Sequence, residues 1–302
     1  MKPIGGSELL HKNLIKYVGN SWEQDINLIL SFTDPNAIDF SRLNVVWQHL
    51  YTDQGAAQGM RYREFTDHIA HYVYVSNWQL EEFKKTFDVY EVSNHVIKNA
   101  IEPIEFKEKP KDKIRLIYTS MPDRGLEVLL EAWRIMNRKD IELIVYSSNI
   151  IYGKGYSDSR SGLYDQLFNI CKTTPGISYK GFGINQAVRK ALQGSHILAY
   201  PSIYPETSCL AAIEAGAAGC KIVTTDFGAL PETCDSWATY VPYISNFSDL
   251  AENYAGILNK SIDSYWSSSY NLEDQSRWFN DYYSWARRAE EWKTFFNKIC
   301  VK

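Results

Sequence analysis

The sequence predicts an α/β protein with two Rossmann-like, doubly wound domains, each a parallel sheet with helices on both faces. Strand-like and helix-like segments alternate almost throughout the chain, as in sheets with helical crossovers. The alternation stops at a charged segment, Glu105–Lys113, and then restarts. With 302 residues the chain is long enough for two domains of ordinary size. We therefore expect one domain at residues 1–110, a second at 111–270, and a terminal helical segment at 271–302.

The elements follow from hydrophobic period and residue type. Runs rich in β-branched and aromatic residues predict strands at residues 26–32, 44–50, 72–77, 114–120, 141–148, 177–182, 196–202 and 221–228. Helical spacing predicts helices at 7–18, 78–87, 124–138, 163–174 and 185–195. From Ser248 the sequence is helical, and residues 281–299 predict one long helix with an aromatic stripe.

The composition of the chain argues against several classes of partner and of protein. The net charge is −4, so a nucleic-acid or anionic-membrane partner is not indicated. The five cysteines form no C-x-x-C pair, which favours a reducing compartment over a disulfide or zinc scaffold. The N-terminus has no signal-peptide core, and no apolar run approaches the roughly 20 residues of a transmembrane helix. We expect a cytoplasmic protein; the sequence does not predict its oligomeric state.

Two glycine-containing turns before helices are candidate anion sites. Arg124 and Gly125 follow a predicted strand and open a helix, an arrangement that binds phosphates through helix N–H groups and a fixed positive charge. The alternative is an arginine on a solvated turn. Gly5 and Gly6 would let backbone N–H groups approach a phosphate closely, unless this segment is a flexible tail.

The position of each histidine in the sequence decides whether it is a candidate ligand contact or a structural residue. His49 comes directly after a predicted strand, at the sheet edge where open α/β sheets bind ligands, and is either a ligand contact or a structural residue. His68 and His71 have helical i, i+3 spacing, but no third ligand accompanies them, so we expect them to be structural. No metal site is predicted.

The segment YPETSCLAAIEAGAAG, residues 204–219, predicts a helix of small residues with two carboxylates. Thr207 or Ser208 is expected to cap it, which would put Glu206 at the mouth of the helix. Glu214, eight positions on, would be half-way along it and needs a partner, because an unpaired buried carboxylate is costly. Ligand hydroxyl groups or an ion pair with a distant residue such as Arg189 would both satisfy it.

Together these segments resemble family 4 of the retaining glycosyltransferases, which have the GT-B fold of two domains facing a cleft. The resemblance covers nearly the whole chain and is strongest from Ile114 to Glu232. It rests on the paired glutamates in PSIYPETSCLAAIEAGAAG, on SMPDRGLEVLLEAW, on PIGGSE, VVWQH, VIKNAIE and TDFGALPE, and on YYSWARRAEEW. The chain departs from the family at Met121, where a basic residue is common. It also lacks the usual first strand, so its first domain is short; the chain is either truncated or builds that sheet differently.

The resemblance implies roles for these parts of the chain. Domain 1–110 would be on the acceptor side, domain 111–270 would bind a nucleotide sugar, and helix 271–302 would cross back to the first domain. Glu214 would bind ribose hydroxyls, and Glu206 and His49 would contact the donor sugar. The base would lie against residues Gly181, Phe182 and Gly183. The diphosphate would be held by Arg124, the Gly5–Gly6 turn and the N–H groups of Thr207, Ser208, Cys209 and Leu210.

The implied activity is transfer of a sugar from a nucleotide donor, such as a UDP- or GDP-sugar, to a hydroxyl group of a glycan, lipid or protein. Retention of anomeric configuration is part of the resemblance. The sequence has no D-x-D pair to hold a Mg²⁺-bridged diphosphate, so a metal-independent reaction without cofactors is expected. Two alternatives stay open: a sugar-nucleotide epimerase of the same fold, and a non-catalytic nucleotide-sugar-binding protein.

Overall fold

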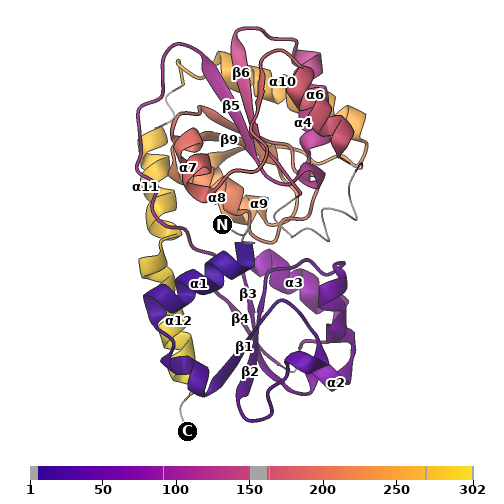
Figure 1. Ribbon diagram of the computed structural model, residues 1–302, viewed down its shortest axis with the longest axis vertical. Helices are drawn as coiled ribbons and strands as arrows, with labels where there is room; N and C mark the ends of the chain where they lie inside the picture. The colour runs from indigo at the N-terminus through magenta and orange to yellow at the C-terminus, as the bar shows by residue number, and fades with distance from the viewer. Residues whose placement is uncertain (1–5, 91, 150–161, 163, 269–270, 301–302) are drawn as a thin grey trace.

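The predicted fold class is confirmed in a computed structural model, which describes residues 6–90, 92–149, 162, 164–268 and 271–300. Two sheets, one of four and one of six strands, are parallel throughout and lie in separate halves of the molecule (Figure 1). The strands of the first sheet end at Val96 and those of the second begin at Ile114. We retain residues 110 and 270 as proposed domain limits.

The first sheet has strand order β1-β2-β3-β4, formed by Ile26–Leu30, Leu43–Gln48, Ile69–Tyr74 and Ser93–Val96. Side chains alternate across it, as a strand requires. Val45 and Trp47 of β2 pack into a core on one face, with α1 (Gly6–Val18), whereas Val46 packs on the other, with Phe65 and Phe83. Two short helices, η3 (Gly55–Arg61) and α2 (Arg63–Thr66), and the helix α3 (Asn77–Thr86) complete this second face.

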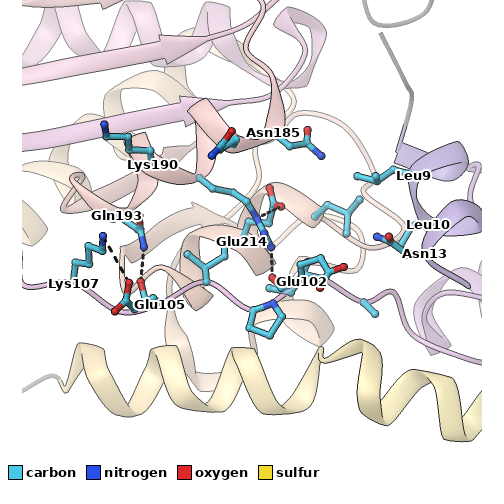
Figure 2. A pocket seen from close by; sticks show the side chains of 17 residues that line it. Leu9, Leu10, Asn13, Glu102, Glu105, Lys107, Asn185, Lys190, Gln193 and Glu214 are labelled. Atoms are coloured by element: carbon cyan, nitrogen blue, oxygen red, sulfur yellow. Dashed lines mark hydrogen bonds and ion pairs between the residues drawn. The ribbon is translucent and has the colours of Figure 1, made fainter. Parts of the chain in front are cut away.

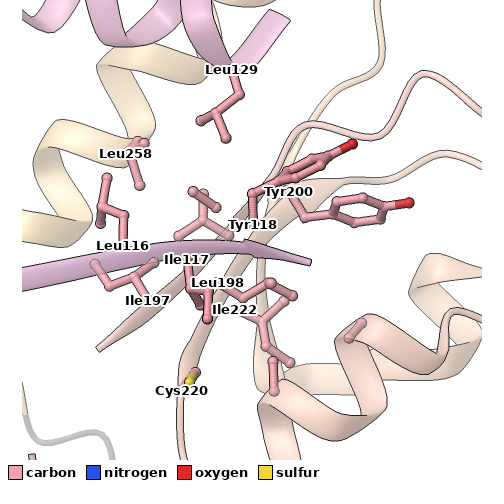
Figure 3. Packing of buried hydrophobic residues seen from close by; sticks show 14 of the residues in the cluster. Leu116, Ile117, Tyr118, Leu129, Ile197, Leu198, Tyr200, Cys220, Ile222 and Leu258 are labelled. Atoms are coloured by element: carbon pink, nitrogen blue, oxygen red, sulfur yellow. The ribbon is translucent and has the colours of Figure 1, made fainter. Parts of the chain in front are cut away.

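The second sheet has strand order β10-β9-β8-β5-β6-β7. Its strands are β5 (Ile114–Thr119), β6 (Ile141–Tyr146), β7 (Ile177–Tyr179), β8 (Ile197–Tyr200), β9 (Lys221–Thr225) and β10 (Ala238–Val241). Its helices are α4 (Leu126–Met136), α6 (Asp165–Thr173), α7 (Asn185–Gln193), α8 (Leu210–Ala217), α9 (Leu230–Cys234) and α10 (Phe247–Asp263). Buried aliphatic residues of the central strands β5 and β8 pack against Leu129 of α4 and Leu258 of α10 (Figure 3).

The strand order reverses between β5 and β8. From β5 the chain builds outward through β6 and β7, then returns to the other side of β5 with β8. At such a reversal the two following loops diverge, and ligands of open α/β sheets bind in the crevice between them. The loops after β5 and β8 carry Arg124 and Glu206, respectively.

The C-terminal segment differs from its prediction. The expected helix over residues 281–299 is two helices, α11 (Leu272–Tyr282) and α12 (Trp285–Ile299), because Ser284 is an N-cap whose side chain accepts from the Arg287 N–H. α11 packs against α8 of the second half, whereas α12 joins the core of the first sheet. At the crossing the Ile101 N–H donates to the Tyr283 carbonyl at 2.8 Å, so the two segments that link the halves lie side by side.

Two strands were missed, β4 and β10. The four residues of β4, Ser93–Val96, contain one β-branched residue, and only their pairing with β3 makes them a strand. β10, Ala238–Val241, is likewise a short edge strand, paired with β9. Tertiary pairing overrides the weak local preference of β4, whereas β10 has favourable residues but is only four residues long.

Candidate active site

The loop after β5 is shaped by Gly125. Met121–Gly125 form a short turn containing the 3-10 helix Pro122–Arg124, and Gly125 has a φ of 119°, which disfavours any side chain. A Cβ at this position would lie 2.0 Å from the carbonyl oxygen of Pro201. The Tyr118 hydroxyl donates to the Met121 carbonyl at 2.5 Å. The loops after β5 and β8 are therefore packed against each other, as the strand order requires.

Arg124 is a buried cation on this turn. Its side chain is 14% exposed, its guanidinium lies 3.2 Å from the centre of the Tyr204 ring, and its Nε is 3.6 Å from Asp123 Oδ1. Burial opposes its charge, but the Glu206 carboxylate and the nearby tyrosines outweigh it and raise the pKa of Arg124 above its usual value. Nη1 is buried without a hydrogen-bond partner among the described residues. This atom is a charged donor suited to an anion.

Glu206 lies in the loop rather than on the helix. Helix α8 begins at Leu210 with Cys209 as N-cap, so the predicted caps Thr207 and Ser208 and the helix-mouth position of Glu206 are wrong. The Glu206 carbonyl accepts from the Ala229 N–H at 2.7 Å, outside any helical ladder. The Tyr200 hydroxyl donates to Glu206 Oε1 at 2.6 Å. This carboxylate is fixed before any ligand arrives.

A neighbouring glycine makes this arrangement possible. Gly228 has a φ of 67°, and a Cβ there would lie 2.6 Å from the backbone nitrogen of Glu206. The segment after β9 thus packs directly on the backbone of Glu206, where a larger residue would displace it.

His49 lies at the carboxyl end of β2, as predicted. Its Nδ1 is 3.2 Å from the Ser31 hydroxyl, while its Nε2 is buried without a hydrogen-bond partner among the described residues. Burial lowers the pKa of His49 to about 3, so the ring is neutral around pH 7. The Thr207 hydroxyl donates to the His49 carbonyl at 2.8 Å, which joins the two halves of the molecule beside Glu206.

Glu214 belongs to a different cluster, on α8. Its side chain is 23% exposed, and Arg189 of α7 lies 3.4 Å away, measured from Nε to Oε1. The ion-pair alternative is therefore the arrangement observed. Burial raises the pKa of Glu214, and the Arg189 charge partly offsets this. Arg189 also donates to the backbone carbonyl of Glu102 in the segment between the sheets.

A cavity of about 540 Å³ opens at this ion pair (Figure 2). It lies between α1, the segment Ala100–Lys107, α7 and α8, and both Glu214 and Leu210 line it. Apolar walls come from Leu9, Leu10, Ile101 and Ile104. Its volume and its mix of apolar walls with many polar and charged side chains suit a small, polar organic ligand. Sequence reasoning missed the contribution of the inter-sheet segment, because its contacts with α7 are more than 80 residues apart.

The glycines predicted to contact the diphosphate and the base lie in different surroundings. Gly5 is outside the described residues. Gly6 is the first residue of α1, and a Cβ on it would lie 3.5 Å from Leu210 Cδ1, so the starts of α1 and α8 are neighbours. Gly181 has a φ of 64°, and Gly183 packs against Tyr146, where an added Cβ would lie at 2.5 Å. Phe182 between them is 41% exposed.

The structure therefore brings the predicted residues together in two groups. Arg124 and Glu206 are close enough for the carboxylate to raise the pKa of Arg124, and the Thr207 hydroxyl bonds to the His49 carbonyl across the two halves, whereas Glu214 and Leu210 line the cavity on α8. Cys209 is buried, and burial raises the pKa of its thiol well above its usual value. Tyr200, Tyr204 and Ser31 support the first group and were not singled out from the sequence. Tyrosines within a predicted strand and its loop gave no sequence indication of this role.

The described residues include neither a metal-ligand cluster nor a membrane-spanning helix. They contain no group of three or more His, Cys, Asp or Glu side chains arranged to hold a metal ion. In the same part of the chain, no helix has the length and apolarity needed to cross a membrane.

Comparison with known proteins finds a family model that matches part of the chain. Residues 113–260 match a family model described as glycosyl transferases group 1. No match was found among curated protein sequences.

Solved structures share the fold over nearly all of the chain. Sucrose-phosphate synthase from Thermosynechococcus elongatus superposes with a TM-score of 0.72 at 13% identity, over 97% of this chain and 78% of that one. An Anabaena protein solved with UDP-glucose superposes with a TM-score of 0.67 at 14% identity, over 97% of this chain and 81% of that one. A Rickettsia africae glycosyltransferase superposes with a TM-score of 0.66 at 16% identity, over 99% of this chain and 83% of that one. The chain spans only 53–61% of three further, longer structures. These likenesses show the GT-B fold.

Proposed function

Residues 113–260 of this chain form a glycosyl transferases group 1 domain, and on that premise we propose that the protein transfers a sugar from a nucleotide-sugar donor to a hydroxyl acceptor. The observation that carries the proposal is that Arg124 and Glu206 interact electrostatically at the reversal of strand order, where the loop of Glu206 bonds to the backbone of His49 in the other half. A buried cation with an unsatisfied donor beside a fixed carboxylate suits a phosphate next to a polyhydroxylated ring.

Arg124 stabilises the leaving group in this mechanism. When the bond between the sugar and the nucleoside diphosphate breaks, negative charge grows on the β-phosphate. Arg124 Nη1 and the backbone N–H groups of the Thr207–Leu210 loop donate to that charge. One preorganised donor of this kind typically contributes roughly 3–4 kcal/mol to lowering the barrier. Gly6 places the start of α1 near the same site.

Glu206 and His49 hold the donor sugar. Tyr200 donates to one oxygen of Glu206, and we assign the other oxygen to sugar hydroxyl groups near the anomeric carbon. The buried Nε2 of His49 is assigned to another hydroxyl of the same sugar. Because the ring is neutral, Nε2 acts as a hydrogen-bonding atom rather than as a charge.

The nucleoside lies toward Glu214. Its carboxylate, held by Arg189, accepts from the ribose hydroxyls, and the cavity of about 540 Å³ beside it gives the nucleoside room. The base contacts backbone groups of residues 181–183. UDP-sugars are the first donors to test, since a structural neighbour was solved with UDP-glucose and another with UDP and GlcNAc; GDP-sugars are the second.

The finer features of the reaction also belong to the proposal. We assign retention of anomeric configuration and metal independence, with Arg124 supplying positive charge at the diphosphate. The acceptor is a hydroxyl group of a glycan, lipid or protein, and the protein acts in the cytoplasm.

A two-stage experiment tests the function. A thermal-shift panel of UDP, GDP, ADP and their sugars identifies the donor, since a ligand that binds only the folded state raises its melting temperature. Release of nucleoside diphosphate is then measured with a panel of hydroxyl acceptors, with and without a chelator. Acceptor-dependent release supports transfer. Binding without release would favour a non-catalytic binding protein, and conversion of the sugar without an acceptor would favour an epimerase.

A further inference from the structure

Glu232 of α9 binds the N-terminus of a helix in the other half of the molecule. Its Oε1 accepts from the Asn77 N–H and the Asn77 side-chain amide, both at 2.9 Å, and its Oε2 accepts from the Trp78 N–H at 2.9 Å. Lys98 Nζ lies 2.5 Å from Oε1. One carboxylate of the second half thus accepts hydrogen bonds from four donors of the first half.

These bonds complete the capping of α3. A helix leaves its first four N–H groups without helical partners. In α3, the N-cap Ser76 accepts from the Gln79 N–H with its hydroxyl, and its carbonyl takes the Leu80 N–H as the first helical bond. Glu232 accepts from two further N–H groups of the first turn, those of Asn77 and Trp78. Two of the first-turn N–H groups of α3 are therefore capped from the other half of the molecule.

The contact is connected to the candidate active site on both sides. In the second half, Ala229 of the same segment donates to the Glu206 carbonyl, three residues before Glu232. In the first half, the Gln79 side chain of α3 donates to the carbonyl of Leu50, the neighbour of His49. A short series of bonds thus runs from Glu206 through Glu232 and α3 to His49.

The helix that carries Glu232 is also bonded to the crossing between the halves. The Tyr283 hydroxyl donates to the Thr233 carbonyl of α9 at 2.9 Å, and Tyr283 is part of the crossing between the halves. The helices that flank the crossing, α11 and α12, lie on one side of the molecule, and α3 lies on the other (Figure 1).

We propose that Glu232 is a positioning residue, which holds the two halves together and so sets His49 against Glu206 and Arg124. The catalytic part of this inference rests on the proposed function, whereas the structural part does not. Burial alone would raise the pKa of Glu232, but the hydrogen bonds from Lys98 and from the N–H groups of Asn77 and Trp78 lower it and so favour the ionised carboxylate.

The test measures inter-domain distance and turnover separately. Spin labels are attached at Arg63→Cys and Lys139→Cys, both exposed positions in different halves, in a Cys300→Ser background. Glu232→Gln keeps the shape but loses the charge and turns an amide N–H₂ toward the donors. We expect a longer or broader distance distribution, and a kcat lower by about 10- to 100-fold with little change in UDP affinity, since misplaced catalytic groups cost rate.

Matched variants complete the design. Glu81→Gln removes an acid of α3 that pairs with Lys84 at the surface, and should keep wild-type distances and turnover. Glu232→Asp keeps the charge and should recover part of the loss. If Glu232→Gln does not fold, Lys98→Met, which removes one donor, should give a smaller change of the same kind.

The outcomes separate the two claims. Unchanged distance distributions in Glu232→Gln would overturn the structural role, whether or not any sugar is transferred. Changed distances with wild-type kcat would overturn the catalytic role. If the wild-type protein transfers no sugar with any donor, the proposed function fails, and the distances still decide whether Glu232 holds the halves together.

Discussion

The two glutamates of the segment Tyr204–Gly219 are held in different ways. Glu206 is fixed by its own neighbourhood, through the Tyr200 hydroxyl six residues earlier and the Ala229 N–H. Glu214 is paired with Arg189 of another helix and lines a cavity. A fixed carboxylate costs no reorganisation at the moment of reaction, whereas a carboxylate in an ion pair must share its charge with a ligand. The first group is therefore suited to turnover and the second to affinity.

Removing the buried cation should have the largest effect. For Arg124→Ala we expect kcat to fall by about 10²- to 10³-fold at saturating donor, because a preorganised donor to the growing charge on the diphosphate is lost. UDP affinity should change much less. Steady-state kinetics with the donor found in the thermal-shift panel measures both quantities.

Arg134→Ala is the control for this variant. Arg134 lies at the other end of α4, and its side chain is exposed and paired with Glu131 at the surface. It should keep wild-type kinetics. A wild-type kcat in Arg124→Ala would remove this residue from the mechanism and, with it, the distinction between a turnover group and an affinity group.

The second effect concerns affinity. Glu214→Gln should weaken UDP binding by about 10- to 100-fold, because hydrogen bonds to a charged group are typically worth about 1.5–3 kcal/mol. The kcat at saturating donor should stay near that of the wild type. Calorimetric titration with UDP tests this, with Glu127→Gln on α4 as the control. Equal affinity of variant and wild type would remove the ribose assignment and leave Glu214 as a structural partner of Arg189.

A smaller effect is expected at Tyr200. Tyr200→Phe removes the hydroxyl that donates to Glu206 and leaves the ring in the core. We expect kcat to fall by about tenfold, since one hydrogen bond that orients a charged group is lost. Tyr254→Phe, which removes another buried hydroxyl of the same domain, bound to the Val223 carbonyl, is the control. Equal kcat values for the two variants would show that Glu206 needs no such support.

Much of the fold was predictable because it depends on local pattern. The strand β8 is a continuous apolar run, β5 is apolar apart from Arg115 and Thr119, and α4 has a strong apolar face, so their type and order follow from the sequence. The strand ends then place Arg124, Glu206 and His49 at one edge of their sheets. The residues of the candidate site were therefore available from the sequence.

Their partners were not predictable, because those contacts join distant segments. Glu214 meets Arg189 through helix packing, and Glu232 meets Asn77 across 155 positions. The break at Ser284 was missed because the aromatic stripe continues on both sides of it. The cap of α8 was missed because Thr207, a good capping residue, bonds to the carbonyl of His49 instead. Sequence pattern predicts which residues form a helix, whereas tertiary contacts select where it begins.

The smallest effect concerns the protonation of His49. It tests whether His49 acts as a neutral hydrogen-bonding group or as a charged group. Its pKa is lowered to about 3 in the folded protein, whereas an unfolded histidine titrates near about 6.5. Between these values the unfolded state binds more protons, so the free energy of unfolding should fall as the pH falls through this range and be fully restored above it.

His49→Asn should lack this contribution. Urea denaturation at about pH 7 and about pH 5 should show the wild type losing on the order of 1 kcal/mol more than the variant over that range. The remaining histidines titrate in both proteins and cancel in the difference. An identical pH dependence would mean that His49 is protonated in the folded state at about pH 5. It would then be a charged group that acts on the donor electrostatically, as Arg124 does, rather than a neutral hydrogen-bonding group.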